Sequence, residues 1–200
     1  SPDWVIDNLR AVGLQPHGEA VALSTAELEV DLYTGSDFKH LRSLTLPKSQ
    51  DRFVDNLWIS PNGKWVAGTT NKPAFMVWRS KAPGVPALQE ELPTLVSSVC
   101  FSPDDSSVVV GQLDGQLRRW NLPASEPPGI SRSLLHGPAF SIVFSPDQRH
   151  LFVGGGAGDR RIRVLDPMTL DVVRDLPERH TSNITDLAVS SDCRLLASVG

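Results

Sequence analysis

The chain has 200 residues, of which 40% are hydrophobic and 21% are charged, and its formal net charge is -4. This composition is typical of a folded globular protein and excludes a mainly disordered one. The acidic balance argues against a protein whose main task is to bind nucleic-acid phosphates, and no apolar run approaches the roughly 20 residues that cross a bilayer.

A polar turn, in most cases one that begins with Ser-Pro, recurs between pairs of apolar segments. The turns begin at Gln15, Ser60, Ser102, Ser145 and Ser190, so the intervals between them are 45, 42, 43 and 45 residues. A period of about 40–45 residues with four strands per unit is the signature of β-propeller blades. Since no helical period persists along the chain, the sequence predicts an all-β protein.

In chain order, the repeats predict four complete blades and part of a fifth, each complete blade being a four-stranded antiparallel sheet. Their approximate bounds are 9–46, 54–92, 96–135, 139–176 and, for the incomplete blade, 183–200. The whole chain is thus interpreted as one partial propeller domain.

The third predicted blade displays the strand pattern most clearly. Val108–Val110 form a second strand and Leu117–Trp120 form a third, and an outer strand is expected near Ser131–Leu135. Asp114-Gly115 lies between the second and third strands. This dipeptide predicts a tight two-residue hairpin turn, which needs a positive φ at both central positions.

The glycine-rich stretch 154–158 lies in the fourth predicted blade. Phosphate-binding loops of similar composition lead into a helix, whose first amides hold the anion. Here the glycines lead into the expected strand Ile162–Leu165, so we interpret them as a widened hairpin loop. Asp159, Arg160 and Arg161 would then lie at its tip.

Three segments carry a resemblance to a known family: FSPDDSSVVVGQLDGQLRRWN, ISPNGKWVAGTTNKPAFMVWR and RHTSNITDLAVSSDCRLLASVG. They resemble blades of WD-repeat β-propellers, and the resemblance extends from about Leu9 to Gly200. The family implies a platform for protein partners. Since most members close with seven blades, which need about 300 residues, we expect these residues to be a fragment of a larger propeller that continues beyond Gly200.

The chain departs from the family pattern because no repeat has an intact Trp-Asp pair. The matching dipeptides are Trp78-Arg79, Trp120-Asn121, Leu165-Asp166 and, loosely, Val30-Asp31. The resemblance assigns structural roles within blades to six residues: Trp78, Asp114, Trp120, Asp159, His180 and Ser198. Because Val110 stands where the family has a serine, we expect the blades to be held mainly by apolar packing.

No arrangement of residues predicts catalysis, a cofactor or a metal site. The five histidines lack metal-ligand spacing, and no Gly-x-Ser-x-Gly elbow is present. Cys100 and Cys193 lie two predicted blades apart, too far for the roughly 4.4–6.8 Å Cα separation of a disulfide. Two unpaired thiols suit a reducing compartment, so we predict a cytoplasmic protein.

The loops that join second to third strands, and outer strands to the next inner strands, gather on one face of a propeller. Short, rigidly held loops of this kind suit docking, and arginine is enriched among residues that dominate interfaces. The predicted partner-binding residues are Asp51, Arg52, Asn71, Lys72, Arg160, Arg161 and Arg179, and Asp114 and His180 belong to the same face.

The function predicted is a non-catalytic scaffold that presents loops to protein partners or to neighbouring domains. Neither nucleic acid nor a membrane is expected as a partner. Two alternatives stay open: a structural building block of a large cytoskeletal or ciliary assembly, and a catalytic or cofactor-binding propeller. A fold alone does not decide among them.

Overall fold

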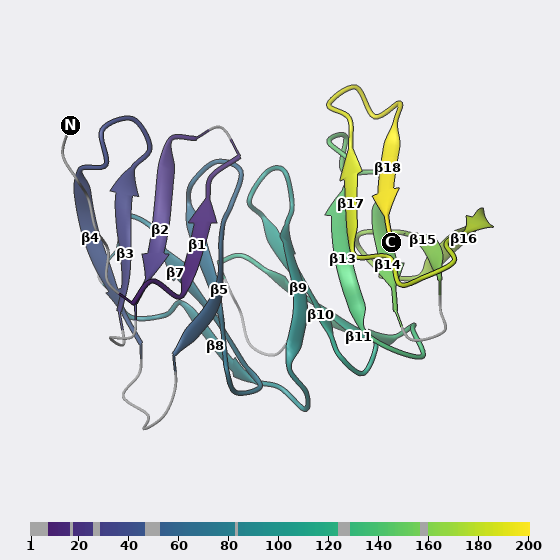
Figure 1. Cartoon of the computed structure of the whole chain (residues 1–200), viewed down its shortest axis with the longest axis horizontal. Coiled ribbons are helices and arrows are strands. Elements are labelled where there is room, and N and C mark those ends of the chain that lie inside the picture. Colours follow the sequence, from purple (N-terminus) through teal and green to yellow (C-terminus); the bar gives the residue numbers. More distant parts are fainter. Residues whose placement is uncertain are drawn as a thin grey trace. The chain divides into compact units, whose positions relative to one another are not determined.

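The computed structural model describes residues 8–16, 18–25, 29–46, 53–82, 84–123, 129–156 and 160–200. Within these ranges every regular element is a β-strand, and no helix occurs (Figure 1). The chain divides into two compact units, Ser1–Pro93 and Thr94–Gly200, which are described separately.

The first unit holds two four-stranded sheets. Each sheet follows chain order with antiparallel neighbours, β1-β2-β3-β4 in the first sheet and β5-β6-β7-β8 in the second. The strands are β1 (Ala11–Leu14), β2 (Ala20–Ser24), β3 (Glu29–Thr34), β4 (His40–Thr45), β5 (Val54–Ile59), β6 (Trp65–Thr70), β7 (Ala74–Arg79) and β8 (Leu88–Glu91).

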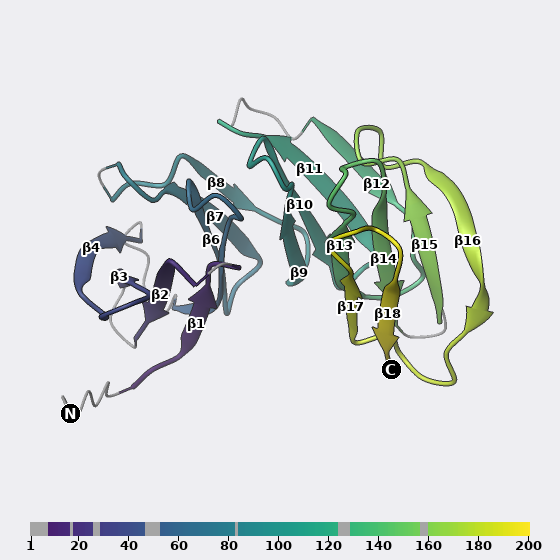
Figure 2. The same ribbon diagram turned by 90° about the horizontal axis from the view of Figure 1, so that it is seen from above.

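The second unit holds two further four-stranded sheets and one two-stranded sheet. Figure 2 shows β13 to β16 in sequence order, with β16 at the outer edge of its sheet. The strands are β9 (Val96–Phe101), β10 (Ser107–Gln112), β11 (Gln116–Asn121), β12 (Ile130–Ser133), β13 (Ala139–Phe144), β14 (Leu151–Gly155), β15 (Arg161–Leu165), β16 (Val172–Arg179), β17 (Asp186–Val189) and β18 (Leu196–Val199).

This architecture confirms the predicted all-β chain of antiparallel, blade-like sheets. Each four-stranded sheet is a simple meander because its connections are short enough to join neighbouring antiparallel strands. Central strands such as β6 and β10 are buried along their whole length. They therefore carry apolar and small residues on both faces, as expected of strands packed between two other layers.

Apolar packing joins the two sheets of the first unit. Val30 and Leu44 of the first sheet belong to one buried cluster with Leu57, Met76 and Trp78 of the second sheet. Trp78 is fully buried, and its indole Nε1 donates a hydrogen bond to the Thr45 carbonyl at 3.2 Å. The tryptophan therefore joins the second sheet to the end of β4 through both packing and a polar contact.

The sheets of the second unit approach so closely that a central strand needs glycine. A Cβ at Gly111 in β10 would lie 2.8 Å from the Ala139 Cβ and 2.9 Å from the Ile142 Cδ1 of the fourth sheet. A Cβ at Gly154 in β14 would lie 2.6 Å from the Cγ2 of Ile184, which lies just before β17. The interpretation of Gly154 and Gly155 as loop residues was wrong, because both lie in β14.

Serine side chains add polar contacts between sheets that the sequence did not predict. Ser98 in β9 donates its hydroxyl hydrogen bond to the Ala139 carbonyl, and Ser141 in β13 accepts one from the Leu187 backbone N–H at 3.0 Å. Both serines lie four residues before the turn serine of their own repeat. That shared offset is the sequence signal that could have indicated these contacts.

The hairpin turn at Asp114-Gly115 differs from the predicted two-residue type. Of these two residues only Gly115 has a positive φ, of 83°, and the Gly115 N–H donates to the Gln112 carbonyl at 3.1 Å. The loop therefore has three residues, Leu113 to Gly115, with glycine in the left-handed position after the turn. Asp114 instead accepts a hydrogen bond from the Gln116 N–H at 3.1 Å.

One local motif, which we call the Ser–Asp turn, recurs three times in the second unit. In each copy the serine hydroxyl donates to the carboxylate two residues later and accepts from the backbone N–H five residues later. The residue after the aspartate has a positive φ. The copies are Ser102–Asp104, Ser145–Asp147 and Ser190–Asp192.

The Ser–Asp turns make stability depend on pH. The serine hydroxyl is the main cause that holds the pKa of Asp104, Asp147 and Asp192 below the ordinary value of 3.8. A carboxyl whose pKa is lowered by folding stabilises the protein above its unfolded pKa, and this stability is lost as pH falls through the folded pKa.

Changing all three aspartates to asparagine is expected to make the acid limb of the stability curve shallower. Asparagine keeps an acceptor oxygen for the turn but cannot titrate. The measurement is the free energy of unfolding in urea between about pH 2 and pH 5, the range in which a lowered carboxyl pKa acts. Equal slopes for the triple variant and the natural chain would contradict this account.

Candidate functional site

The candidate site in the second unit is the end at which β14, β16 and β18 finish. We call it the Arg160 end and define it by Asp114, Arg160, His180 and Ser198. It lies opposite the β9–β10, β13–β14 and β17–β18 turns, which form the upper end of this unit in Figure 1. Asp114 and Arg160 are exposed there.

His180 holds this end together through its backbone and its ring. The His180 N–H donates to the Arg160 carbonyl at 3.1 Å, and the ring Nε2 lies 2.7 Å from the Ser198 hydroxyl. The structure thus brings His180 and Ser198 into contact across the fourth and fifth sheets. Asp114 and Trp120, by contrast, share no hydrogen bond: Asp114 bonds within its own turn, and Trp120 is fully buried in β11.

The two arginines of this region differ in what surrounds their guanidinium groups. Arg161 is the first residue of β15 rather than part of a loop tip, and it forms an ion pair with Asp175 of β16 at 3.1 Å. Arg163 approaches the same carboxylate at 3.6 Å. Among the residues that the structure describes, the exposed Arg160 guanidinium has no such partner.

In the first unit, the predicted residues Asn71 and Lys72 lie in the β6–β7 turn. The Asn71 Oδ1 accepts a hydrogen bond from the Phe53 N–H at 3.2 Å, so its amide shapes the loop before β5. The Lys72 backbone bonds to the Thr70 hydroxyl, and its side chain is exposed. Asp51, Arg52 and Asp159 lie outside the described residues, as does the side chain of Arg179.

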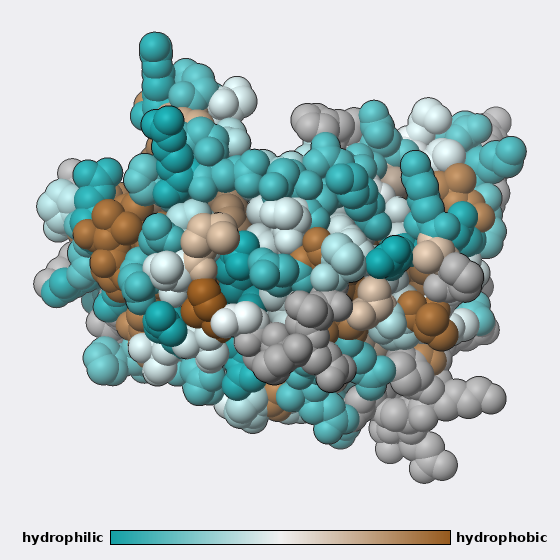
Figure 3. Space-filling view, turned by 180° about the vertical axis from the view of Figure 1, so that it is seen from behind, coloured by the Kyte–Doolittle hydropathy of each residue, from teal (hydrophilic) through white to brown (hydrophobic). Residues whose placement is uncertain are grey.

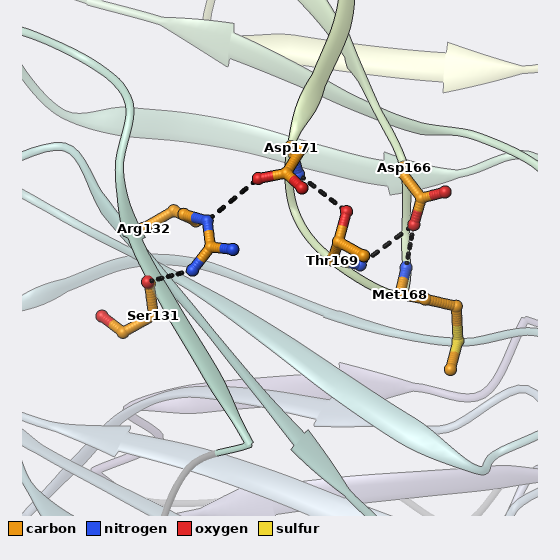
Figure 4. A network of polar contacts seen from close by, with 6 residues as sticks. All are labelled: Ser131, Arg132, Asp166, Met168, Thr169 and Asp171. Carbon is orange, nitrogen blue, oxygen red and sulfur yellow. Dashed lines mark hydrogen bonds and ion pairs between the residues drawn. The ribbon is translucent and has the colours of Figure 1, made fainter.

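A polar network on the β15–β16 turn links the third and fourth sheets (Figure 4). Arg132 of β12 donates from Nε to the Asp171 carboxylate at 3.1 Å. The Thr169 hydroxyl, and then the Arg132 guanidinium, lower the pKa of Asp171. The Asp166 carboxylate accepts from the Met168 and Thr169 N–H groups at 2.8 and 2.9 Å, which fixes the turn. These contacts tie β12 to the β15–β16 turn.

Arg119 lies beside this network in β11 and is only 6% exposed. Its guanidinium donates to the Asn121 side chain at 2.7 Å and approaches the Met168 sulfur at 3.5 Å. Burial lowers the pKa of Arg119, while the charges of Asp104 and Asp166 oppose that shift. This positive charge is enclosed by the protein and does not face solvent.

Neither thiol of the chain is part of a disulfide. Cys100 and Cys193 are both free. Desolvation raises the pKa of Cys100 to about 11, so this group is a thiol and not a thiolate at neutral pH.

Within the described ranges, no group of three or more His, Cys, Asp or Glu residues is placed to hold a metal ion. The described part of the chain also has no helix long and apolar enough to cross a membrane.

The exposed surface mixes apolar and polar residues. On the side drawn in Figure 3, hydrophobic residues form small patches separated by hydrophilic ones. Scattered exposed apolar residues are normal on protein surfaces and do not identify a docking site. Charge and rigidity are therefore the more informative properties of the candidate surfaces.

Comparison with known proteins places the repeats in a family. Residues 90–121, 131–166 and 172–200 match the family model described as WD domain, G-beta repeat. Each matched segment contains one of the three Ser–Asp turns. A search of curated proteins found no match to the chain.

Proposed function

The chain belongs to the WD-repeat family, and from that premise we propose that it is a non-catalytic scaffold that contacts a protein partner through the Arg160 end. WD repeats generally mediate protein–protein interaction, and their propellers are typically not enzymes. The two free thiols favour a reducing compartment for this activity.

The observation that carries the proposal is an exposed arginine whose backbone carbonyl is hydrogen-bonded to the end of β16. The Arg160 carbonyl accepts from the His180 N–H, and the His180 ring contacts Ser198, so three segments support one loop end. Because the Arg160 backbone is held at this point, it loses less conformational freedom when a partner binds. Arginine also offers five N–H donors to a partner's carboxylates and carbonyls.

Changing Arg160 to glutamate is expected to weaken partner capture. The substitution reverses the charge of an exposed side chain that makes no hydrogen bond or ion pair within the described part of the chain, so folding should be unaffected. A partner that pairs with Arg160 then meets a like charge, which reduces affinity about tenfold or more when the arginine is an interface anchor. The measurement is affinity capture from cell extract with quantification of each captured protein.

Arg149→Glu is the matched control, because it makes the same charge change at the opposite end of the fourth sheet. Its side chain is 81% exposed, and its contact with Asp147 at 3.9 Å is a surface pair of little energetic weight. Loss of a captured protein with Arg160→Glu and its retention with Arg149→Glu would support the proposal. If every captured protein survives Arg160→Glu, the Arg160 end is not the docking surface.

A further inference from the structure

Two adjoining cavities open in the first unit, the larger between its first and second sheets and the smaller along the second sheet. Their volumes are about 410 and 330 Å³. Asn62, Gly63, Ser80 and Lys81 line both, so the two cavities form one continuous groove, which we call the basic groove. It lies at the end of the β1–β2 and β3–β4 turns, which is the upper end of this unit in Figure 1 and opposite Asn71 and Lys72.

The larger cavity has an apolar interior. Leu32 and Ile59 line it and are 3% and 5% exposed, while Leu41 at its rim is 50% exposed. A half-exposed leucine beside a buried apolar wall is a contact surface for another apolar side chain. Burial of such a side chain contributes about 1.5–3 kcal/mol when it leaves water completely.

The rim of the basic groove is strongly cationic. Arg42 and Lys81 line the larger cavity, and Lys64, Arg79 and Lys81 line the smaller one. Glu19 is the one carboxylate among the lining residues of both cavities, all of which the structure describes. The concentration of four cations here contrasts with the net charge of -4 for the whole chain.

Two of these cations are held in position by the protein. The Arg42 guanidinium donates to the Ala82 carbonyl at 3.2 Å, which ties β4 to the β7–β8 loop. The Arg79 guanidinium lies over the Trp65 ring, 5.4 Å from its centroid. Positioned guanidinium groups retain donors in a fixed fork that matches a carboxylate. The groove is therefore preorganised for negatively charged groups.

We propose that the basic groove binds an acidic segment of a partner protein in extended conformation. One apolar side chain of the segment enters the cavity beside Leu41, and its carboxylates pair with Arg42, Arg79 and Lys81. The cations are spread along two adjoining cavities, while the apolar wall belongs to the larger one. An extended peptide can reach both cavities at once and place one apolar side chain against that wall. The inference rests on the proposed protein-binding role but assigns it a second surface.

The test is fluorescence anisotropy with the full chain and a labelled peptide in which Asp and Glu alternate with Leu. The natural chain should bind this peptide more tightly than a matched peptide that carries Asn and Gln in place of the acids. Binding should weaken as salt is added, because exposed ion pairs are screened. Arg42→Glu combined with Lys81→Glu should reduce affinity about tenfold or more, since two attractive contacts become repulsive.

Two further variants keep the test decisive. Lys81→Glu alone changes an exposed loop residue and should fold normally while still weakening binding, whereas the double variant also loses the Arg42–Ala82 contact. Arg149→Glu with Arg194→Glu makes the same charge change on exposed turns of the second unit and should leave affinity within about twofold, because long-range charge effects are screened.

Several results would overturn the proposal. They are equal binding of the acidic and neutral peptides, unchanged affinity in both groove variants, and an equal loss in the Arg149 and Arg194 control. Binding to phosphatidylserine vesicles that depends on Arg42 and Lys81, with no peptide binding, would identify a membrane surface instead. Because the groove variants leave Arg160 intact, failure here and failure of the Arg160 end are separate outcomes.

Discussion

Replacing Trp78 by alanine is expected to lower the free energy of unfolding by about 3–5 kcal/mol, the usual cost of removing a large buried aromatic side chain. Trp78 is fully buried and packs in the cluster that joins the two sheets of the first unit. The fold leaves room for the indole at Gly68, where a Cβ would lie 3.0 Å from the ring. Removing the indole therefore leaves a cavity beside Gly68, which has no side chain to fill it.

Two comparison variants separate the causes of this loss. Trp78→Phe keeps most of the apolar packing but removes the donor to the Thr45 carbonyl, and its cost should be about 1–3 kcal/mol. Trp58→Ala makes the same change as Trp78→Ala at a half-buried position in β5 and should cost less. Urea unfolding measures all three. A loss for Trp78→Ala no larger than that for Trp58→Ala would disprove its role in joining the sheets.

Replacing Gly115 by alanine is expected to produce the second large loss of stability. The left-handed conformation at φ 83° costs a residue with a Cβ about 1–2 kcal/mol. In addition, the new Cβ would lie 2.2 Å from the Leu135 carbonyl oxygen and 2.8 Å from that of Gly137. Because both are backbone atoms, the β12–β13 loop must move, and the Leu134 and Leu135 N–H bonds to Gly115 are disturbed.

Gly18→Ala provides the matched control for this prediction. Gly18 also has a positive φ, of 73°, but nothing lies within 4 Å of the position its Cβ would take. It should therefore lose only the backbone contribution of about 1–2 kcal/mol. Hydrogen exchange should reveal lower protection of the Leu134 and Leu135 amides in Gly115→Ala alone. Equal losses in the free energy of unfolding for the two glycine variants would mean that the β12–β13 loop moves without a cost in free energy.

The turn chemistry illustrates how far local sequence carries a prediction. The Ser–Asp turns depend on atoms within five residues of each other, so the repeat of Ser102, Ser145 and Ser190 was enough to place them. The Asp114-Gly115 turn was misjudged because its type is coupled to the β12–β13 loop, some twenty residues away. In that position glycine is needed both for its φ and for the nearby carbonyl oxygens.

The candidate surfaces also depend on contacts between distant residues that local sequence does not predict. Arg160 and Arg161 are neighbours of the same residue type, yet of the two only Arg161 forms an ion pair with Asp175 of β16. Arg42 and Lys81 are 39 residues apart and meet at one groove only because the first and second sheets pack together. No pattern in the sequence singled out either residue, since each occupies an ordinary polar position of its strand or loop.

By itself, the sequence determined that this is an all-β chain built of repeated antiparallel sheets, because strand alternation, turn residues and the interval between repeats are properties of neighbouring residues. Only the tertiary structure decided which charges are paired, which glycines face a neighbouring sheet and where cations gather around a groove. Those properties depend on strand register and on the close packing of sheets, which bring together residues that lie tens of positions apart in the chain.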